Sequence, residues 1–382
     1  MTISVQQLVR QIHDAQTRFV LAVAGGGISA LDHLLEVPGA SRSVLEAVVP
    51  YSPAAMAKWL GGKPDQSCSS PTARAMAMVA FFRARQYDET AAGLAGLACT
   101  AALATDRPRQ GSHRAYLAAQ TAEATVHWCL ELAKGRRTRP EEERLVGSVL
   151  LNLVAETCGL EARLPLALGD AEHLEPCKFV APDPWRKLLL GQSRLAQAIG
   201  PPQAGGATRR RAIFPGAFNP LHSGHRRMAQ VAQALLGVPA EFEISILNVD
   251  KPPLDYWEIN RRVAQFSSAE VVWLTRASTF CEKASLFPGA IFIVGADTLR
   301  RIADPRYYAD EPAACSRAIE LLAACDCRFL VFARAVGGCL LSLADLQLPN
   351  TLRSICEEVP ASQFREDICS THLRAAIGEQ PE

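Results

Sequence analysis

The stretch of sequence that decides the fold of the second half of this 382-residue chain is Ala212-Ile213-Phe214-Pro215-Gly216-Ala217-Phe218-Asn219-Pro220-Leu221-His222-Ser223-Gly224-His225. It begins with a short apolar run of strand-forming residues and passes through a loop that contains glycine and proline. It then leads into an amphipathic segment, Arg226–Leu236. A strand, a loop and a helix in this order are typical of an α/β fold.

Further apolar runs follow in the same half, and helical segments separate several of them. The predicted strands are Ala212–Phe214, Phe242–Leu247, Val271–Thr275, Ile291–Val294 and Phe329–Phe332. The predicted helices are Arg226–Leu236, Ile259–Ser267 and Ala313–Ala324. Continuously apolar strands that alternate with helices indicate a parallel sheet covered on both faces. Ligands of such sheets bind beyond the carboxyl ends of the strands, so a site is expected directly after them.

The loop after the first predicted strand carries groups that suit a phosphate. His222 and His225 are three residues apart at a helix start, so their imidazoles can share one face. Gly216 has no Cβ, which lets the backbone approach a phosphate closely. Helix N-termini attract anions, and two imidazoles there suit a phosphoryl group under attack. The alternatives are a turn with two surface histidines, or a zinc site, although no third histidine or acidic residue lies nearby to complete one.

The pattern Gly216-x-Phe218-x-Pro220-x-His222-x-Gly224-His225 resembles the signature of the nucleotidylyltransferase superfamily, Rossmann-like enzymes with a (T/H)xGH motif. The first position of the short motif is histidine here, as in the adenylyltransferases of that superfamily. The resemblance implies that Gly216, Phe218 and Gly224 bind a nucleotide, and that His222 and His225 are catalytic.

A second string near the C-terminus is similar to a late motif of the same superfamily. Ile368-Cys369-Ser370-Thr371-His372-Leu373-Arg374 resembles the Ile-Ser-Ser-Thr-x-Ile-Arg string of pyridine-mononucleotide adenylyltransferases. The hydroxyls of Ser370 and Thr371 and the guanidinium of Arg374 are groups that bind phosphates. The alternative is a helix cap followed by a solvated arginine. Cys369 departs from the family string, because it replaces a serine hydroxyl.

Two other segments fit the family more loosely. Lys251 follows the second predicted strand, where these enzymes often hold a lysine near the substrate phosphate, and an exposed loop lysine is the alternative. Gly295 and Asp297 follow the fourth predicted strand and resemble the Gly-x-Asp segment of the nucleotide pocket. Asp297 either bonds a ribose hydroxyl or caps the next helix.

The resemblance implies an adenylyltransferase that joins ATP to nicotinamide or nicotinate mononucleotide and releases pyrophosphate, as in NAD biosynthesis or salvage. His222, His225, Lys251 and Arg374 are the expected catalytic residues, and Mg²⁺ is expected to bridge the triphosphate of ATP. No metal site formed by the protein alone is expected. The alternatives are another phosphomonoester as acceptor, such as phosphopantetheine, and a nucleotide-binding regulator without catalysis.

Residues from Phe19 to about Thr157 resemble the C-terminal domain of CinA proteins, a family that includes nicotinamide-nucleotide amidases. The resemblance rests on Ala24–Ala30, Val37–Ser41 and Val48–Ser52. The catalytic serine of that family falls on Val23, so this half is expected to be an inactive amidase, with residual amide hydrolysis as the alternative. Its loop Gly25–Gly27 is either a tight turn or a phosphate-binding loop.

These patterns predict an α/β protein of two domains, whose C-terminal one has a Rossmann-like parallel sheet with helices on both faces. The expected parts are a CinA-like domain (1–160), a connector and linker (161–208) and a nucleotidyltransferase domain (209–382). Ser4–Ala15 and Glu141–Thr157 have helical spacing. The segment Glu161–Leu195 reads as an irregular connector that ends in a short helix, Trp185–Ala196.

The overall composition excludes several classes of protein. Lys and Arg total 40 against 39 Asp and Glu, so no strong charge points to nucleic acid or a membrane surface. The first ten residues have no apolar signal segment, and the 12 cysteines are scattered, which favours reduced thiols in the cytoplasm. The expected ligands are small molecules, and a homo-oligomer is compatible with the sequence.

Overall fold

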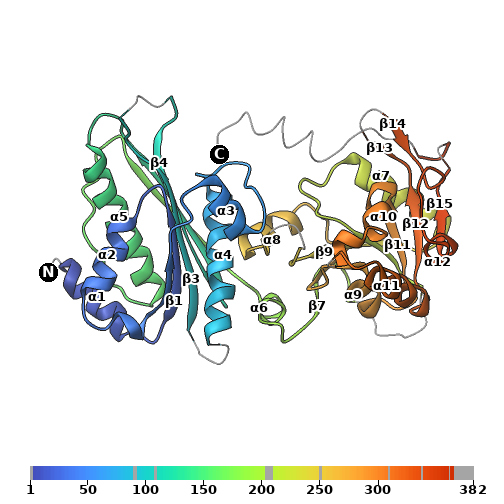
Figure 1. Cartoon of the computed structure of the whole chain (residues 1–382), viewed down its shortest axis with the longest axis horizontal. Coiled ribbons are helices and arrows are strands. Elements are labelled where there is room, and N and C mark those ends of the chain that lie inside the picture. The colour runs from blue at the N-terminus through green and yellow to red at the C-terminus, as the bar shows by residue number, and fades with distance from the viewer. Residues whose placement is uncertain are drawn as a thin grey trace. The chain divides into compact units, whose positions relative to one another are not determined.

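The computed structural model describes residues 3–88, 93–106, 110–202, 210–248, 252–308, 310–336, 339–360 and 362–364. The chain divides into two compact units. The first comprises Met1–Arg186 together with Asp250–Glu258, and the second comprises Lys187–Val249 together with Ile259–Glu382. Each unit is a sheet with helices packed against it (Figure 1), which confirms the α/β class predicted from the sequence.

The first unit is a six-stranded mixed sheet in the order β2-β1-β3-β4-β5-β6. Its strands are β1 (Arg18–Ala24), β2 (Val44–Val48), β3 (Leu94–Ala102), β4 (His113–Thr121), β5 (Ala124–Leu132) and β6 (His173–Val180). Its helices are α1 (Val5–Asp14), α2 (Ile28–Glu36), α3 (Pro53–Leu60), α4 (Ser70–Tyr87) and α5 (Arg139–Thr157), with a short 3₁₀ turn at Ala40–Arg42. The two helices predicted at Ser4–Ala15 and Glu141–Thr157 are therefore confirmed.

Helices cover both faces of this sheet. Apolar residues of α1, α2 and α5 form the larger core on one face, and those of α3 and α4 form a smaller core on the other (Figure 1). Helix α4 approaches β3 so closely that a Cβ on Gly96 would lie 2.1 Å from the carbonyl oxygen of Ala77. A glycine is therefore required at this position, because no larger residue leaves room for the helix backbone.

The second unit is a seven-stranded sheet in the order β15-β12-β11-β8-β9-β10-β7. Its strands are β7 (Leu195–Ile199), β8 (Ala212–Pro215), β9 (Ala240–Ser245), β10 (Val271–Thr275), β11 (Ile291–Gly295), β12 (Arg328–Phe332) and β15 (Cys356–Glu358). Its helices are α7 (Ser223–Leu236), α9 (Phe280–Leu286), α10 (Ala296–Ile302), α11 (Pro312–Ala324) and α12 (Asn350–Ser354), with a 3₁₀ turn at Pro305–Tyr308. Two elements cross the boundary between the units, α6 (Asp183–Leu190) and α8 (Tyr256–Val263). A separate ribbon joins β13 (Arg334–Val336) to β14 (Cys339–Leu341).

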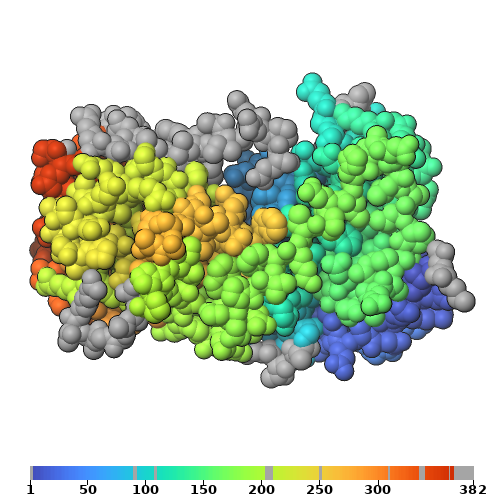
Figure 2. All heavy atoms as spheres, turned by 180° about the vertical axis from the view of Figure 1, so that it is seen from behind, coloured from blue at the N-terminus to red at the C-terminus, as the bar shows by residue number. Residues whose placement is uncertain are grey.

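All five strands and all three helices predicted in the second half are present, within a few residues of the predicted bounds. The main sheet is parallel except for β7, which pairs antiparallel with β10. Helices α9, α10 and α11 pack against one face of the sheet. Helix α7 buries Met228, Val231 and Ala232, and its outward face forms part of the surface coloured yellow in Figure 2.

The predicted connector and linker (161–208) contain two strands that sequence periodicity did not indicate. Strand β6 lies within Glu161–Leu195 and pairs antiparallel with β5, with Pro176 opposite Trp128. Its proline and its many exposed residues are not typical of a strand, yet they are tolerated because β6 is an edge strand. The helix predicted over Trp185–Ala196 ends at Leu190, because Gly191 follows with φ +78°. Strand β7 then occupies Leu195–Ile199, which is the start of the stretch assigned to the linker.

Among the described residues, no helix combines the length and the apolar character needed to cross a bilayer. The ten cysteines whose side chains the structure describes are all free thiols.

Candidate functional site

The candidate site lies where the strand order of the second unit reverses. The chain runs from β8 to β9 and β10 on one side, and then returns to β11 on the other side of β8. Strands β8, β9, β11 and β12 are parallel, so their carboxyl ends meet at one edge of the sheet. A crevice forms at such a switch point because the connections on the two sides leave in opposite directions. The loop that begins at Gly216 stands at this point.

Hydrogen bonds fix the backbone of this loop from several sides. The N–H of Gly216 donates to the carbonyl oxygen of Glu243 at 3.0 Å. The side chain of Gln265 bridges the loop, because its Nε2 donates to the Phe218 carbonyl at 2.9 Å and its Oε1 accepts the Leu221 N–H at 2.8 Å. Arg262 donates to the carbonyl oxygen of Ala217 at 3.1 Å. A loop held at so many backbone groups is preorganised rather than free to adapt.

Phe218 is the anchor of the loop. Its backbone has φ 44°, which is uncommon for a residue with a side chain, and only 1% of the residue is exposed. Its ring packs against Phe214, Phe242 and Phe266. A Cβ on Gly216 would lie 2.5 Å from this ring, so the glycine makes room for Phe218. The structure thus places the Phe218 side chain in the core, beneath the site, where it supports the loop.

The two histidines form a stacked pair at the start of α7. His222 is the N-cap and His225 lies in the first turn, with their ring centroids 3.7 Å apart and the ring planes 26° from parallel. The Nδ1 atom of His225 accepts the backbone N–H of His222 at 3.3 Å. Gly224, between them, is buried. The ring of His225 rests edge-on against Phe218, with centroids 5.1 Å apart. The two imidazoles therefore share one face of the helix start, as predicted.

His222 is 9% exposed, and neither of its ring nitrogens has a hydrogen-bond partner among the described residues. Buried polar atoms are nearly always paired in folded proteins, so an unpaired imidazole marks a place where a ligand or water supplies the partner. Two nitrogens on one ring can donate to one group and accept from another.

Both imidazoles favour the neutral form. Burial, followed by the nearby His222 and Arg334, lowers the pKa of His225 to about 3. Burial and the charge of Arg334 also lower the pKa of His222 from its usual 6.5. At neutral pH the pair therefore provides uncharged hydrogen-bonding groups, and a cation must come from another side chain.

Arg334 is that cation, and it was missed in the sequence. It lies two residues after the end of β12, at the start of β13, and its charge acts on both histidines. Its Cδ lies 4.0 Å from the point that a Cβ on Gly295 would occupy. The rule of searching after each strand would have found it, since Phe329–Phe332 was a predicted strand.

Gly295 and Asp297 lie on the same edge, after β11. Gly295 is the N-cap of α10, and a Cβ there would lie 2.4 Å from Oδ1 of Asp297. The carboxylate thus folds back over the glycine, and a larger residue at position 295 would displace it. The N-cap of this helix is thus Gly295, and Asp297 lies in the first turn. The structure brings together Gly216, Gly224, His222, His225, Gly295 and Asp297 around the carboxyl ends of β8 and β11, with Arg334 from the end of β12.

The remaining predicted residues lie outside the described part of the chain. These are Lys251, Ser370, Thr371 and Arg374, together with Cys369.

In the first unit, the glycine-rich loop Gly25–Gly27 is a turn, and a carboxylate of the same chain binds its backbone N–H groups. The backbone N–H groups of Gly27 and Ser29 each donate to Glu143 at 3.1 Å. Arg139 donates to the carbonyl oxygen of Gly25 at 2.8 Å. Val23 is fully buried in β1. The N–H groups that would receive a phosphate are therefore occupied, and no hydroxyl stands at position 23.

Comparisons with known proteins give a partial likeness. No protein-family model matches the chain, and no curated protein sequence matches it either. The solved structures that resemble it include the competence/damage inducible protein CihA of Agrobacterium tumefaciens, with 19% identity and a TM-score of 0.34, which covers 41% of this chain and 98% of that one. A CinA superfamily protein of Escherichia coli has 17% identity and a TM-score of 0.31, covering 40% of this chain and 88% of that one. One from Enterobacter cloacae has 18% identity and a TM-score of 0.34, covering 41% and 94%.

Proposed function

We propose that the second unit transfers the adenylyl group of ATP to the phosphate of a small phosphomonoester, a pyridine mononucleotide, and releases pyrophosphate. The observation that carries this proposal is the stacked pair His222 and His225 at the switch point of a parallel sheet, with both ring nitrogens of His222 unpaired among the described residues and the charge of Arg334 beside the pair. Donors and a cation around a helix N-terminus at this position suit a phosphate chain.

The reaction needs no covalent bond to the protein. An oxygen of the acceptor phosphate attacks the α-phosphorus of ATP in line, a new P–O bond forms, and the bond to the α,β-bridging oxygen breaks. The electron pair of that bond leaves with pyrophosphate. Catalysis is then positioning and charge stabilisation. In this scheme the N–H groups of His222 and His225 donate to phosphate oxygens, and Arg334 balances the negative charge that gathers in the transition state.

Mg²⁺ would supply further neutralisation of the triphosphate when it enters with ATP. Asp297 offers a carboxylate on the edge that carries the histidines. Mg²⁺ in nucleotide enzymes is commonly held by one or two carboxylates together with substrate phosphates, so this residue fits such an ion. Lys251, Ser370, Thr371 and Arg374 are proposed to complete the phosphate contacts.

The choice of acceptor rests on the resemblance of Ile368–Arg374 to the late motif of pyridine-mononucleotide adenylyltransferases. The CinA-like features of the first half suggest the same class of ligand, because some CinA relatives act on nicotinamide nucleotides. We propose a cytoplasmic enzyme of NAD biosynthesis or salvage on this basis, in which the first unit, with Val23 and a filled glycine loop, is not a hydrolase.

A screen of pyrophosphate release tests the proposal. Purified protein with Mg²⁺ and ATP is offered nicotinamide mononucleotide, nicotinate mononucleotide and phosphopantetheine, with CTP in place of ATP as a nucleotide control. The double variant His222→Ala/His225→Ala, purified in the same way, reports any contaminating enzyme. We expect release with ATP and one of the pyridine mononucleotides. Pyrophosphate release with phosphopantetheine alone would identify phosphopantetheine, and not a pyridine mononucleotide, as the acceptor. Saturable ATP binding without pyrophosphate release from any combination of nucleotide and acceptor would indicate a regulator.

A further inference from the structure

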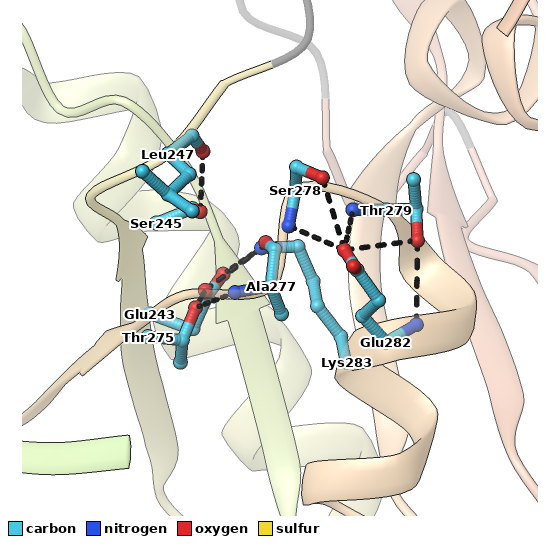
Figure 3. A network of polar contacts seen from close by, with 9 residues as sticks. All are labelled: Glu243, Ser245, Leu247, Thr275, Ala277, Ser278, Thr279, Glu282 and Lys283. Atoms are coloured by element: carbon cyan, nitrogen blue, oxygen red, sulfur yellow. Dashed lines mark hydrogen bonds and ion pairs between the residues drawn. The ribbon is translucent and has the colours of Figure 1, made fainter. Parts of the chain in front are cut away.

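A buried ion pair lies beside the candidate site and takes no part in the chemistry proposed above. Glu243 of β9 is fully buried and Lys283 of α9 is 6% exposed. The ammonium of Lys283 donates to both carboxylate oxygens of Glu243 at 2.7 Å, and to the carbonyl oxygen of Ala277 at 2.9 Å. All three ammonium hydrogens therefore have an acceptor. Figure 3 shows the pair between the ends of two strands and the first turn of the helix.

The pair ties three elements together at the carboxyl edge of the sheet. Thr275, near the end of β10, donates its hydroxyl to the Glu243 carboxylate and accepts the N–H of Ala277 at 3.2 Å. The start of α9 is held in turn by Glu282, whose carboxylate accepts the backbone N–H groups of Ser278 and Thr279 at 2.7 and 2.9 Å (Figure 3). The ends of β9 and β10 are thus locked to α9.

The same residue of β9 holds the loop of the candidate site. The carbonyl oxygen of Glu243 accepts the N–H of Gly216, the first residue of that loop. At the same time, the carboxylate of Glu243 accepts two hydrogen bonds from Lys283. Any shift of the Glu243 backbone therefore moves the acceptor on which Gly216 depends, and the loop from Gly216 leads directly to His222.

Stability alone gives little reason for this arrangement. Removing two charges from water costs about as much as their attraction returns, and well-packed apolar residues usually replace a buried ion pair without loss of stability. What an ion pair adds is direction, because its hydrogen bonds fix the position of each partner. Directional control is useful here, since donors that stabilise a transition state must be held within about 0.5 Å.

We propose that Lys283 is a positioning residue: through Glu243 it fixes the strand end that receives the Gly216 N–H, and so holds the loop that carries His222 and His225. The effect on the backbone is a property of the fold itself. Its consequence for turnover rests on the proposed adenylyl transfer.

Amide hydrogen exchange followed by NMR tests the first part without reference to any activity. In Lys283→Met we expect the Gly216 amide to exchange at least about tenfold faster than in the wild type, as expected for a local opening, while amides of β11 and β12 keep their protection. Lys283→Arg, which retains the charge and the donors, should restore slow exchange. Arg306→Met, at an ion pair whose arginine side chain is 77% exposed, is the matched control and should change nothing.

The double variant Glu243→Leu/Lys283→Met separates positioning from simple stability. We expect it to unfold at a denaturant concentration close to that of the wild type and still to show fast Gly216 exchange. Wild-type exchange at Gly216 in a folded double variant would overturn the proposal.

Kinetics test the second part. For a wild type that releases pyrophosphate, Lys283→Met should lower kcat about tenfold or more with a KM for ATP that changes less than about threefold, because the loop donors act in the transition state. Fast exchange with unchanged kcat would overturn the catalytic consequence. If the wild type itself releases no pyrophosphate, the adenylyl-transfer proposal fails, and the exchange data still decide whether Lys283 positions the loop.

Discussion

His222 and His225 stack as two neutral imidazoles at the first turn of α7, with ring centroids 3.7 Å apart. Two protonated rings at this distance would repel each other, whereas two neutral rings can lie in contact. Burial makes the neutral state the stable one, since it lowers the pKa of both rings. The pair is therefore built to offer hydrogen bonds, and Arg334 provides the charge.

This division of roles predicts the effect of Arg334→Gln. Loss of the guanidinium removes a positive charge that opposes protonation, so the pKa of both His222 and His225 should rise, as measured from imidazole shifts in an NMR titration. The kcat for pyrophosphate release should fall about tenfold or more, because the lost charge acts in the transition state. Arg317→Gln, an exposed change on α11, is the control. Histidine pKa values that stay unchanged in Arg334→Gln would remove this residue from the site.

The lowered pKa of His225 also predicts how stability depends on pH. The folded protein binds this proton only near pH 3, whereas the unfolded chain binds it near 6.5, so the unfolded state gains protons first as the pH falls. Stability from this group is complete above about pH 6.5 and is lost as the pH falls towards 3. Between about pH 7 and 5, the wild type should lose about 1–2 kcal/mol more than His225→Gln in urea unfolding. If the unfolding free energies of the two proteins changed with pH in parallel, His225 would not be buried in its neutral form.

Phe218→Ala should destabilise the second unit by about 3–5 kcal/mol, because it empties a fully buried aromatic position. The loss should appear in the denaturant midpoint, and ATP binding should weaken with it, since the ring supports His225. Leu321→Ala, at a residue that is 44% exposed in the same unit, is the control and should change stability by less than about 1 kcal/mol. A near-wild-type Phe218→Ala would mean that the loop does not depend on this anchor.

In the first unit, Glu143→Ala leaves the N–H groups of Gly27 and Ser29 without their acceptor. We expect a loss of about 1–3 kcal/mol in unfolding free energy, the usual cost of buried donors left unpaired. Glu161→Ala, an exposed change in the same unit, should be neutral. A neutral Glu143→Ala would instead mean that solvent already reaches these N–H groups.

Much of the second unit was predictable because its strands are short, apolar and separated by amphipathic helices. The same patterns located the loop Gly216–His225, since its glycine, proline and histidine spacing follows directly after a strand. The first unit was harder to predict. Strand β3 is entirely buried and rich in alanine, which gives no period-two signal, and β6 carries Pro176 at the sheet edge.

The candidate site, too, could be predicted only in part from local sequence patterns. His222 and His225 lie close together in the sequence, so their shared face follows from helix geometry. Arg334 reaches them only because β12 lies next to β11, and β11 next to β8. Likewise, the aromatic contacts that place Phe218 in the core come from β9 and Phe266, which only the folded chain brings together. Long-range pairing of this kind leaves no mark in local periodicity.

The central claim is that the histidine pair at the start of α7 stabilises adenylyl transfer, and steady-state pyrophosphate release by His225→Ala tests it most directly. With the acceptor found for the wild type and saturating ATP, turnover should fall about a hundredfold or more, the effect of one lost transition-state donor. His33→Ala, in the first unit, should match the wild type under the same conditions. A His225→Ala protein that is folded and turns over within about twofold of the wild type would contradict the account.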